Sequence, residues 1–309
     1  MDRDEITVEL AAELVAEQFP QWADLAVVEV PLNGWDNTTF RLGDELSIRL
    51  PSGEGYAAAV SKEHRWLPVL APQLPVSIPQ PVAMGWPGDR YPWPWSIYRW
   101  LPGTPASQAR IPNMDRFATQ LAGLLNALHA ADISDAPAAG PGSAHRGGPL
   151  SYYDDEEIPQ ALDLLADRYN NTDTLRQVWL TALSSEWQHP PVWIHGDFTG
   201  SNLLATEDGD LSAVIDFGCA AVGDPACDLT IAWTFFAETS AAQFRENLAL
   251  DKNTWARARG WALWKAFVTI LRAKKNDRDE CADARRFGWK QDPYEVIDRV
   301  LADHADVVS

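Results

Sequence analysis

Residues 192–233 have the sequence VWIHGDFTGSNLLATEDGDLSAVIDFGCAAVGDPACDLTIAW. Three short apolar runs, Val-Trp-Ile, Leu-Leu-Ala and Ala-Val-Ile, are separated in it by a polar loop and by a Glu-Asp-Gly-Asp turn. Short apolar runs with Gly/Asp turns between them predict small strands and a hairpin. We therefore expect Asp197, Asn202 and Asp216 to meet at one end of a compact hairpin.

These three side chains are of the types that phosphoryl transfer uses. Mg²⁺, which accompanies a nucleoside triphosphate, is a hard cation that takes oxygen ligands, and Asn202 and Asp216 would supply two of them. Asp197 is an acceptor that could orient and deprotonate an attacking hydroxyl group. Gly196 lets the backbone turn sharply, so that Asp197 would project into a cleft.

Three motifs occur in this stretch in one order: His-Gly-Asp-x-x-x-x-Asn from His195, Asp-Phe-Gly from Asp216, and Gly-Asp-Pro-x-x-Asp-Leu from Gly223. Protein kinases have H-R-D-x-x-x-x-N followed by D-F-G, with Arg in place of the present Gly. On these motifs the chain resembles the kinase-like phosphotransferases, specifically the aminoglycoside phosphotransferase family. The resemblance implies that His195 and Asp228 support the loop rather than take part in the chemistry.

The 309 residues carry a formal net charge of −19, with 46% hydrophobic and 22% charged residues. This composition is ordinary for a globular protein, and the length is sufficient for a sizeable core and two lobes. Nucleic acid is not an expected partner, because binding to its phosphates requires Lys and Arg. An acidic surface favours a cationic ligand such as a polyamine antibiotic, although it could equally serve solubility alone.

The chain has no apolar run long enough to span a membrane. Its acidic N-terminus, MDRDEITVEL, has no signal-peptide pattern, so we expect a cytoplasmic protein. We expect it to be a monomer or a homodimer. The three cysteines, Cys219, Cys227 and Cys281, show neither a disulfide framework nor a metal-binding spacing.

The order of the predicted elements indicates the fold class. Strand patterns dominate the first hundred residues and helical patterns the remainder, which is typical of an α+β protein. With the family resemblance, this predicts a two-lobed protein-kinase-like fold. A small β-rich N-lobe that binds nucleotide would occupy residues 1–102, and a larger, mostly helical C-lobe with the catalytic loop and substrate site would occupy residues 103–309.

The first lobe is predicted to begin with an amphipathic helix, followed by three antiparallel strands. The helix spans 6–19, and the strands span 25–30, 38–42 and 46–51. By the resemblance, the loop that ends in Asn37 and Thr38 lies over the nucleotide phosphates. The chain has neither GxGxxG in this loop nor GxxxxGK[ST] elsewhere, so it is not predicted to be a P-loop protein.

Arg49 occupies the position where kinases carry the phosphate-binding lysine, and no lysine precedes Lys62. Arginine remains charged and can bind phosphate through two parallel hydrogen bonds. Glu63, in a predicted helix at 56–70 that the proline-rich segment from Pro68 would stop, is expected to be its ion-pair partner. A solvated strand arginine and a surface glutamate are the alternatives.

The segment 72–94 is rich in proline, which suits edge strands and turns. A strand at 95–100 follows, and in the family this is the hinge between the lobes. The resemblance implies that the backbones of Arg99 and Trp100 contact the nucleotide base.

The second lobe is predicted to be helical outside the motif stretch. Asn113 is a suitable N-cap for the first of these helices. The expected helices span 114–131, 172–187, 229–238, 241–250, 254–274 and 293–302, with a charged turn at 276–283.

Acceptor binding is predicted at Ser-Tyr-Tyr-Asp-Asp-Glu-Glu, residues 151–157, where aromatic rings precede four acids. The candidates are Tyr153, Asp154, Asp155, Glu156 and Glu157, and Glu238 is one further candidate. Acids at the start of a helix, favoured there by the helix dipole, are the alternative.

Together these features predict an O-phosphotransferase that uses Mg²⁺ and ATP or GTP to phosphorylate a hydroxyl group of a small molecule. An aminoglycoside is the favoured acceptor. A macrolide is the nearest alternative, followed by a choline-, homoserine- or sugar-type metabolite. From another class, the chain could be a pseudokinase that binds nucleotide and signals through a partner, but the intact Asp197, Asn202 and Asp216 argue against this.

Overall fold

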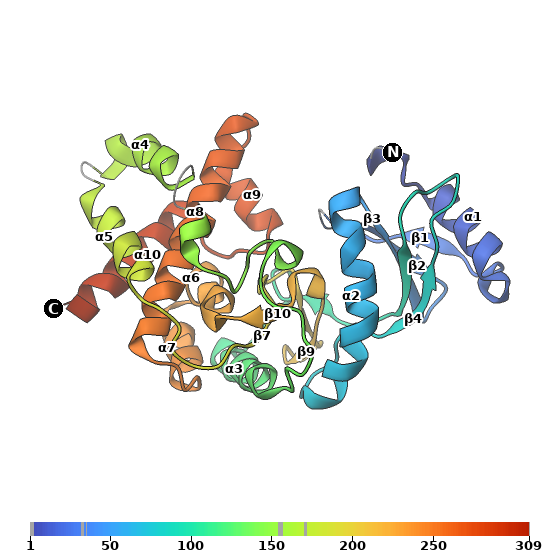
Figure 1. Cartoon of the computed structure of the whole chain (residues 1–309), viewed down its shortest axis with the longest axis horizontal. Coiled ribbons are helices and arrows are strands. Elements are labelled where there is room, and N and C mark those ends of the chain that lie inside the picture. The colour runs from blue at the N-terminus through green and yellow to red at the C-terminus, as the bar shows by residue number, and fades with distance from the viewer. Residues whose placement is uncertain (1–2, 32–33, 35, 154–156, 170–171, 309) are drawn as a thin grey trace. The chain divides into compact units, whose positions relative to one another are not determined.

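The computed structural model describes residues 3–31, 34, 36–153, 157–169 and 172–308. The chain divides into two compact units, Met1–Pro102 and Gly103–Ser309 (Figure 1). Unit 1 is built on an antiparallel sheet, and unit 2 consists mainly of helices with two small sheets. Among the described helices, none has the length and apolarity needed to cross a membrane.

The sheet of unit 1 has five strands, and every neighbouring pair in it is antiparallel. In spatial order the strands are β1 (Val27–Glu29), β2 (Asn37–Leu42), β3 (Leu46–Pro51), β5 (Trp95–Arg99) and β4 (Pro81–Gly85). The proline-rich segment thus contributes an edge strand, where a missing N–H is tolerated.

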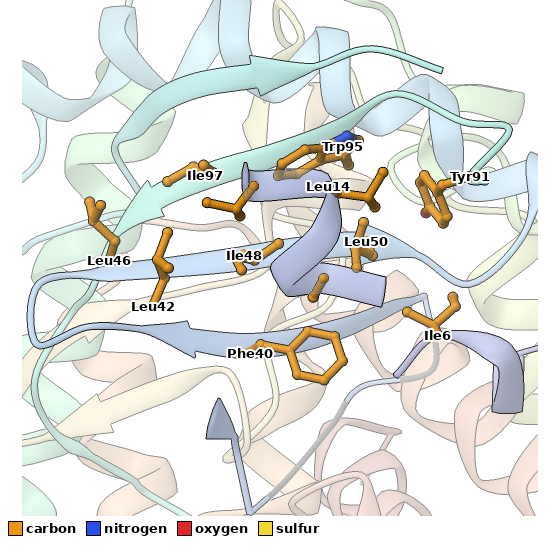
Figure 2. Close-up of a cluster of buried hydrophobic side chains, with 12 residues drawn as sticks. Ile6, Leu14, Phe40, Leu42, Leu46, Ile48, Leu50, Tyr91, Trp95 and Ile97 are labelled. Carbon is orange, nitrogen blue, oxygen red and sulfur yellow. The ribbon is translucent and has the colours of Figure 1, made fainter. Parts of the chain in front are cut away.

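The core of unit 1 lies between this sheet and the helix α1 (Val8–Gln18). Successive side chains of a strand point to opposite faces, so Ile48 and Leu50 of β3 face α1 and its Leu14 (Figure 2). Trp95 of β5 fills the same core and is fully buried. The other face of β3, which carries Arg49, is covered by α2 (Glu54–Leu70).

The helix α2 ends at Leu70, the residue at which the sequence predicts its end, and it includes Pro68. Proline in a helix removes one N–H donor, but the next turn still closes, since the N–H of Ala71 donates to the carbonyl of Leu67. One missing hydrogen bond in the last turn therefore does not end a helix that is held by its buried face.

Unit 2 is organised around the long helix α8 (Lys252–Lys275), which is buried along most of its length and packs against helices on several sides. The other described helices are α3 (Met114–Ala130), α4 (Glu157–Tyr169), α5 (Asp173–Leu183), α6 (Ile231–Thr234), α7 (Glu238–Glu246), α9 (Glu280–Arg286) and α10 (Pro293–Val308). The predicted cap of α3 is confirmed, since the side chain of Asn113 accepts from the N–H of Arg116 at 2.9 Å.

Two helix predictions in unit 2 were wrong. The expected charged turn at 276–283 contains the start of α9, because the side chain of Asp279 accepts from the N–H of Ala282 and so caps a short helix. The single helix expected at 229–238 is instead a 3₁₀ turn η7 (Pro225–Thr230), the short α6, and a break before α7.

The motif stretch forms two small sheets rather than one hairpin. The strand β7 (Val192–Ile194) pairs with β10 (Ala221–Gly223), whereas β8 (Leu203–Ala205) pairs with β9 (Leu211–Val214) and with β6 (Thr104–Pro105). Only β8 and β9 form the predicted hairpin. The polar loop therefore connects one sheet to the other.

We predict that Gly85→Ala destabilises unit 1. A Cβ atom at Gly85 would lie 2.0 Å from Cε2 of the buried Trp95, and overpacking of a core costs about 1–3 kcal/mol. Thermal unfolding should show a clear loss of stability. Gly88→Ala is the matched control, because a Cβ at that exposed glycine meets no atom within 4 Å; equal melting temperatures for the two variants would contradict the prediction.

Candidate active site

The loop that follows β7 is fixed by a buried carboxylate. Asp228, which is fully buried in η7, accepts the N–H of His195 with Oδ2 and the N–H of Gly196 with Oδ1, both at 2.7 Å. Burial raises the pKa of Asp228 to about 6, although its interactions with His195 and Gly196 act in the opposite direction. Asp228 therefore holds the backbone just before Asp197.

The ring of His195 is fully buried and supports the same loop. Its Nδ1 accepts the N–H of Asp197 at 3.2 Å, and its Nε2 lies 3.0 Å from the carbonyl oxygen of Ile215. A ring nitrogen that accepts carries no proton, so Nε2 is the protonated nitrogen and donates to Ile215. Phe198 and Phe217 pack against the ring, with centroids at 4.6 and 4.7 Å.

Glycine is required at position 196. Its φ is +84°, and a Cβ atom there would lie 2.8 Å from the carbonyl oxygen of Cys219. The left-handed region is open to glycine at little cost. The sharp turn brings Asp197 out of the buried loop, and its side chain is 41% exposed.

The structure brings Asp197 and Asn202 together directly, and Asp216 next to them through the backbone. Nδ2 of Asn202 donates to the backbone oxygen of Asp197 at 3.0 Å and to its Oδ2 at 3.4 Å. The N–H of Ile215 donates to the carbonyl of Asn202 at 2.9 Å, and Asp216 follows Ile215. Asp216 has a φ of +68°, an uncommon conformation for a residue other than glycine.

The donor set at this point suits Mg²⁺. Because Nδ2 of Asn202 donates to Asp197, the other amide atom, Oδ1, remains as an acceptor, and Asp216 adds a carboxylate. Oxygen ligands from one or two side chains, completed by water and phosphate, are the usual binding mode of Mg²⁺. Within the described ranges no group of three or more His, Cys, Asp or Glu side chains forms a metal site.

Two cations near Asp197 were not identified from the sequence. Nζ of Lys265, in α8, lies 3.0 Å from Oδ1 of Asp197, and Arg146 is also close. Burial would raise the pKa of Asp197, but the charges of Lys265 and Arg146 outweigh it and lower that pKa below its ordinary value. Lys265 lies on the same helical face as Trp261 and Trp264, and a lysine at a core-facing position was the signal that could have revealed it.

In unit 1, Arg49 and Glu63 form the expected ion pair. Nη1 of Arg49 lies 3.3 and 3.4 Å from the two carboxylate oxygens of Glu63. Glu63 is buried and also accepts the hydroxyl group of Tyr98. The glutamate is thus fixed by two partners and in turn holds the guanidinium group on the α2 side of the sheet.

The other residues predicted to bind nucleotide lie on the same sheet. Thr38 is buried in β2, where its Oγ1 has no hydrogen-bond partner within the described structure, and Asn37 begins the strand. The N–H groups of Arg99 and Trp100 donate to the carbonyls of Gln80 and Glu45 at 2.9 and 2.7 Å. Any contact of Arg99 and Trp100 with a base would therefore have to use other backbone groups.

Of the predicted acceptor-binding residues, Tyr153 and Glu157 both contact Trp264, whereas Glu238 lies on another helix, α7. The hydroxyl group of Tyr153 accepts from Nη1 of Arg146 at 2.9 Å, and Glu157 accepts the indole N–H of Trp264 at 2.6 Å. Glu238 is exposed in the first turn of α7. Asp154, Asp155 and Glu156 lie outside the described residues.

The model of the phosphotransferase enzyme family matches residues 27–261. No curated protein sequence matches the chain.

Solved structures share the fold. The GDP complex of wild-type aminoglycoside 2′-phosphotransferase-IIIa has a TM-score of 0.67 at 20% identity, over 96% of this chain and 99% of that one. The streptomycin–ATP–APH(2″)-IIa ternary complex gives 0.56 at 18%, over 93% and 97%. Macrolide 2′-phosphotransferase MphH from Brachybacterium faecium gives 0.59 at 20%, over 91% and 98%. The predicted kinase-like α+β fold is confirmed.

The raised pKa of Asp228 predicts a dependence of stability on pH. Between its ordinary pKa of 3.8 and about 6, the folded chain binds a proton at this site that the unfolded chain has lost, so stability falls as pH rises. From pH 5 to pH 7 this amounts to about 1 kcal/mol. Denaturant unfolding of the wild type should show this loss relative to Asp228→Asn, which has no such proton; parallel pH profiles would contradict the assignment.

Proposed function

Because the chain belongs to the phosphotransferase enzyme family, we propose that it transfers the γ-phosphate of ATP or GTP to a hydroxyl group of a small molecule. One observation carries the proposal: Asp197, Asn202 and Asp216 are gathered at one loop, which two buried residues hold. The hydroxyl oxygen would attack the γ-phosphorus, the bond to the β–γ bridging oxygen would break, and a nucleoside diphosphate would leave.

Asp197 is proposed to accept the hydroxyl proton. Its lowered pKa keeps it ionised at neutral pH, and its half-exposed side chain is accessible to an acceptor. A weak base suffices, because phosphoryl transfer depends mainly on positioning and on stabilisation of charge. The hydrogen bond from Asn202 and the ion pair with Lys265 support a fixed orientation of the carboxylate.

Asn202 and Asp216 are proposed to hold Mg²⁺ through Oδ1 and the carboxylate. When bound, the ion would neutralise charge on the phosphate oxygens. In unit 1, Arg49 is proposed to bind the phosphate chain, since its guanidinium group is directed by Glu63 and can form two parallel hydrogen bonds. The buried hydroxyl group of Thr38, which has no hydrogen-bond partner among the described residues, is a further proposed contact of the nucleotide.

For the acceptor, the sequence favours an aminoglycoside, both by the family resemblance and by its acidic charge. Structures that share the fold include aminoglycoside and macrolide phosphotransferases. At identities of 17–20% the likeness is one of fold. An acceptor panel of aminoglycosides, macrolides and metabolite alcohols, assayed for nucleoside diphosphate release with ATP and with GTP, is the direct test.

We predict that Asp197→Ala reduces phosphate transfer by about 10²–10⁴-fold, which is the usual contribution of a general base. Nucleotide affinity, measured by calorimetry with Mg²⁺, should stay within about threefold, because the nucleotide does not depend on this carboxylate. Retained turnover would remove Asp197 as the proton acceptor. Asp216→Ala provides the contrast: it should weaken Mg²⁺-dependent nucleotide binding itself, and unchanged binding would remove the metal assignment.

We predict that Arg49→Ala weakens nucleotide binding by about 10–100-fold, because a hydrogen bond to a charged group contributes about 1.5–3 kcal/mol. Arg49→Lys, which restores the residue that kinases use, should recover part of this affinity. Arg90→Ala is the matched control, since Arg90 is an exposed arginine of the same unit that pairs with Glu13. Equal affinities for Arg49→Ala and Arg90→Ala would exclude a phosphate contact.

A further inference from the structure

Arg146 is held in place by aromatic rings. Its Cζ lies 4.2 Å from the ring centroid of Trp264 and 5.7 Å from that of Trp261, and its Nη1 donates to the hydroxyl group of Tyr153. A cation over an indole face is attracted by the ring, and the guanidinium group is planar. The rings therefore fix the plane of the guanidinium group.

Arg146 differs in its partners from Arg245, Arg257 and Arg259, three other arginines packed inside unit 2. Arg257 is paired with Asp224, and both Arg245 and Arg259 are paired with Asp303. For Arg146, by contrast, no carboxylate within the described residues lies at ion-pair distance. A half-buried guanidinium group that is oriented by rings and lacks an acid is suited to bind an acid from outside.

This arginine lies beside the catalytic loop. A Cβ atom added to Gly196 would come within 3.2 Å of Cβ of Arg146, and Gly196 precedes Asp197. On α8, Lys265 follows Trp264, the ring that carries Arg146, and forms the 3.0 Å ion pair with Asp197. The proposed proton acceptor is therefore flanked by two positive charges from different elements.

We propose that the acceptor is a hydroxyl compound that carries an acidic group, a carboxylate or a phosphate, which Arg146 binds while the hydroxyl group lies at Asp197. Arginine pairs with either acid through two parallel N–H donors. The inference rests on the proposed phosphotransferase activity and specifies its acceptor.

A polycationic acceptor does not fit these charges. For its hydroxyl group to reach Asp197, its ammonium groups would have to approach Lys265 and Arg146, and like charges in a partly buried site repel one another. Glu157, the nearest described acid on α4, already accepts the indole N–H of Trp264. Asp154, Asp155 and Glu156 lie outside the described residues and carry no part of the argument.

Three polyols that differ at one carbon test the inference. Gluconate, sorbitol and glucamine have a carboxylate, a hydroxymethyl and an aminomethyl group at that position, and sorbitol 6-phosphate adds the phosphate arm. Binding to the full chain would be measured by saturation-transfer NMR and titration. We expect gluconate or sorbitol 6-phosphate to bind at least tenfold more tightly than glucamine; the stronger of the two identifies the acidic group.

The variant Arg146→Gln should weaken binding of the preferred acid at least tenfold and leave sorbitol binding within twofold. Arg168→Gln is the matched control, because Arg168 also stacks on a ring, that of Tyr294 at 4.0 Å, but is exposed on α4. Any of three results would overturn the inference. These are binding of glucamine as tight as that of both acids, no binding of either acid, and equal effects of the two variants. The comparison of the polyols uses only the wild-type protein, so it does not depend on whether either variant folds.

Failure of the inference can be distinguished from failure of the proposed function. Turnover that depends on Asp197 with cationic acceptors alone would overturn the acidic acceptor and leave the phosphotransferase proposal intact. Acid binding that depends on Arg146, without Asp197-dependent release of nucleoside diphosphate from any acceptor, would support the anion site and count against the activity.

Discussion

The two hydrogen bonds from His195 and Gly196 to the buried carboxylate of Asp228 determine the rest of the catalytic loop. They fix two consecutive peptide groups. The chain then turns outward at Gly196, which has a left-handed backbone conformation. The imidazole ring then accepts from Asp197 and donates to Ile215, which connects the loop to the residue before Asp216. Burying the carboxylate costs free energy. The two hydrogen bonds offset this cost, because without them two buried backbone N–H groups would have no acceptor.

The helix α8 is coupled to the same segment. Arg257, in its second turn, forms an ion pair with Asp224 at 2.6 Å, four residues before Asp228. Two turns further along, Lys265 reaches Asp197. A helix that is fixed at Asp224 therefore carries its lysine to the carboxylate which Asp228 has positioned from the other side. Asp197 is therefore held by the catalytic loop and by α8. Both are attached to the segment 224–228, the loop through Asp228 and the helix through Asp224.

The sequence predicted the features that lie within one motif stretch or that the family resemblance implies. It did not predict contacts between residues that are far apart in the sequence. His195, Asn202, Asp216 and Asp228 lie within one short stretch, whose motifs resemble those of the family and so indicated a shared site. The resemblance to kinases also implied the pair Arg49–Glu63. Pairing of β7 with β10 was missed, since it depends on which strand packs nearest in space. Arg146 and Lys265 were missed because no motif includes them; only folding of α8 and of the loop before η5 (Leu150–Tyr153) brings them to Asp197.

The net charge of the chain and the charges beside Asp197 have opposite signs. The net charge of −19 sums the charges of the whole chain, and salt screens exposed charges beyond about 8 Å under physiological conditions. Lys265 acts on Asp197 across 3.0 Å in a partly buried setting, where screening is weak. Because electrostatic energy rises steeply at such distances, two nearby cations outweigh many distant acids in selecting what approaches the carboxylate. Under the proposed acceptor binding, the many acidic residues would favour solubility, while Lys265 and Arg146 would select an acidic acceptor.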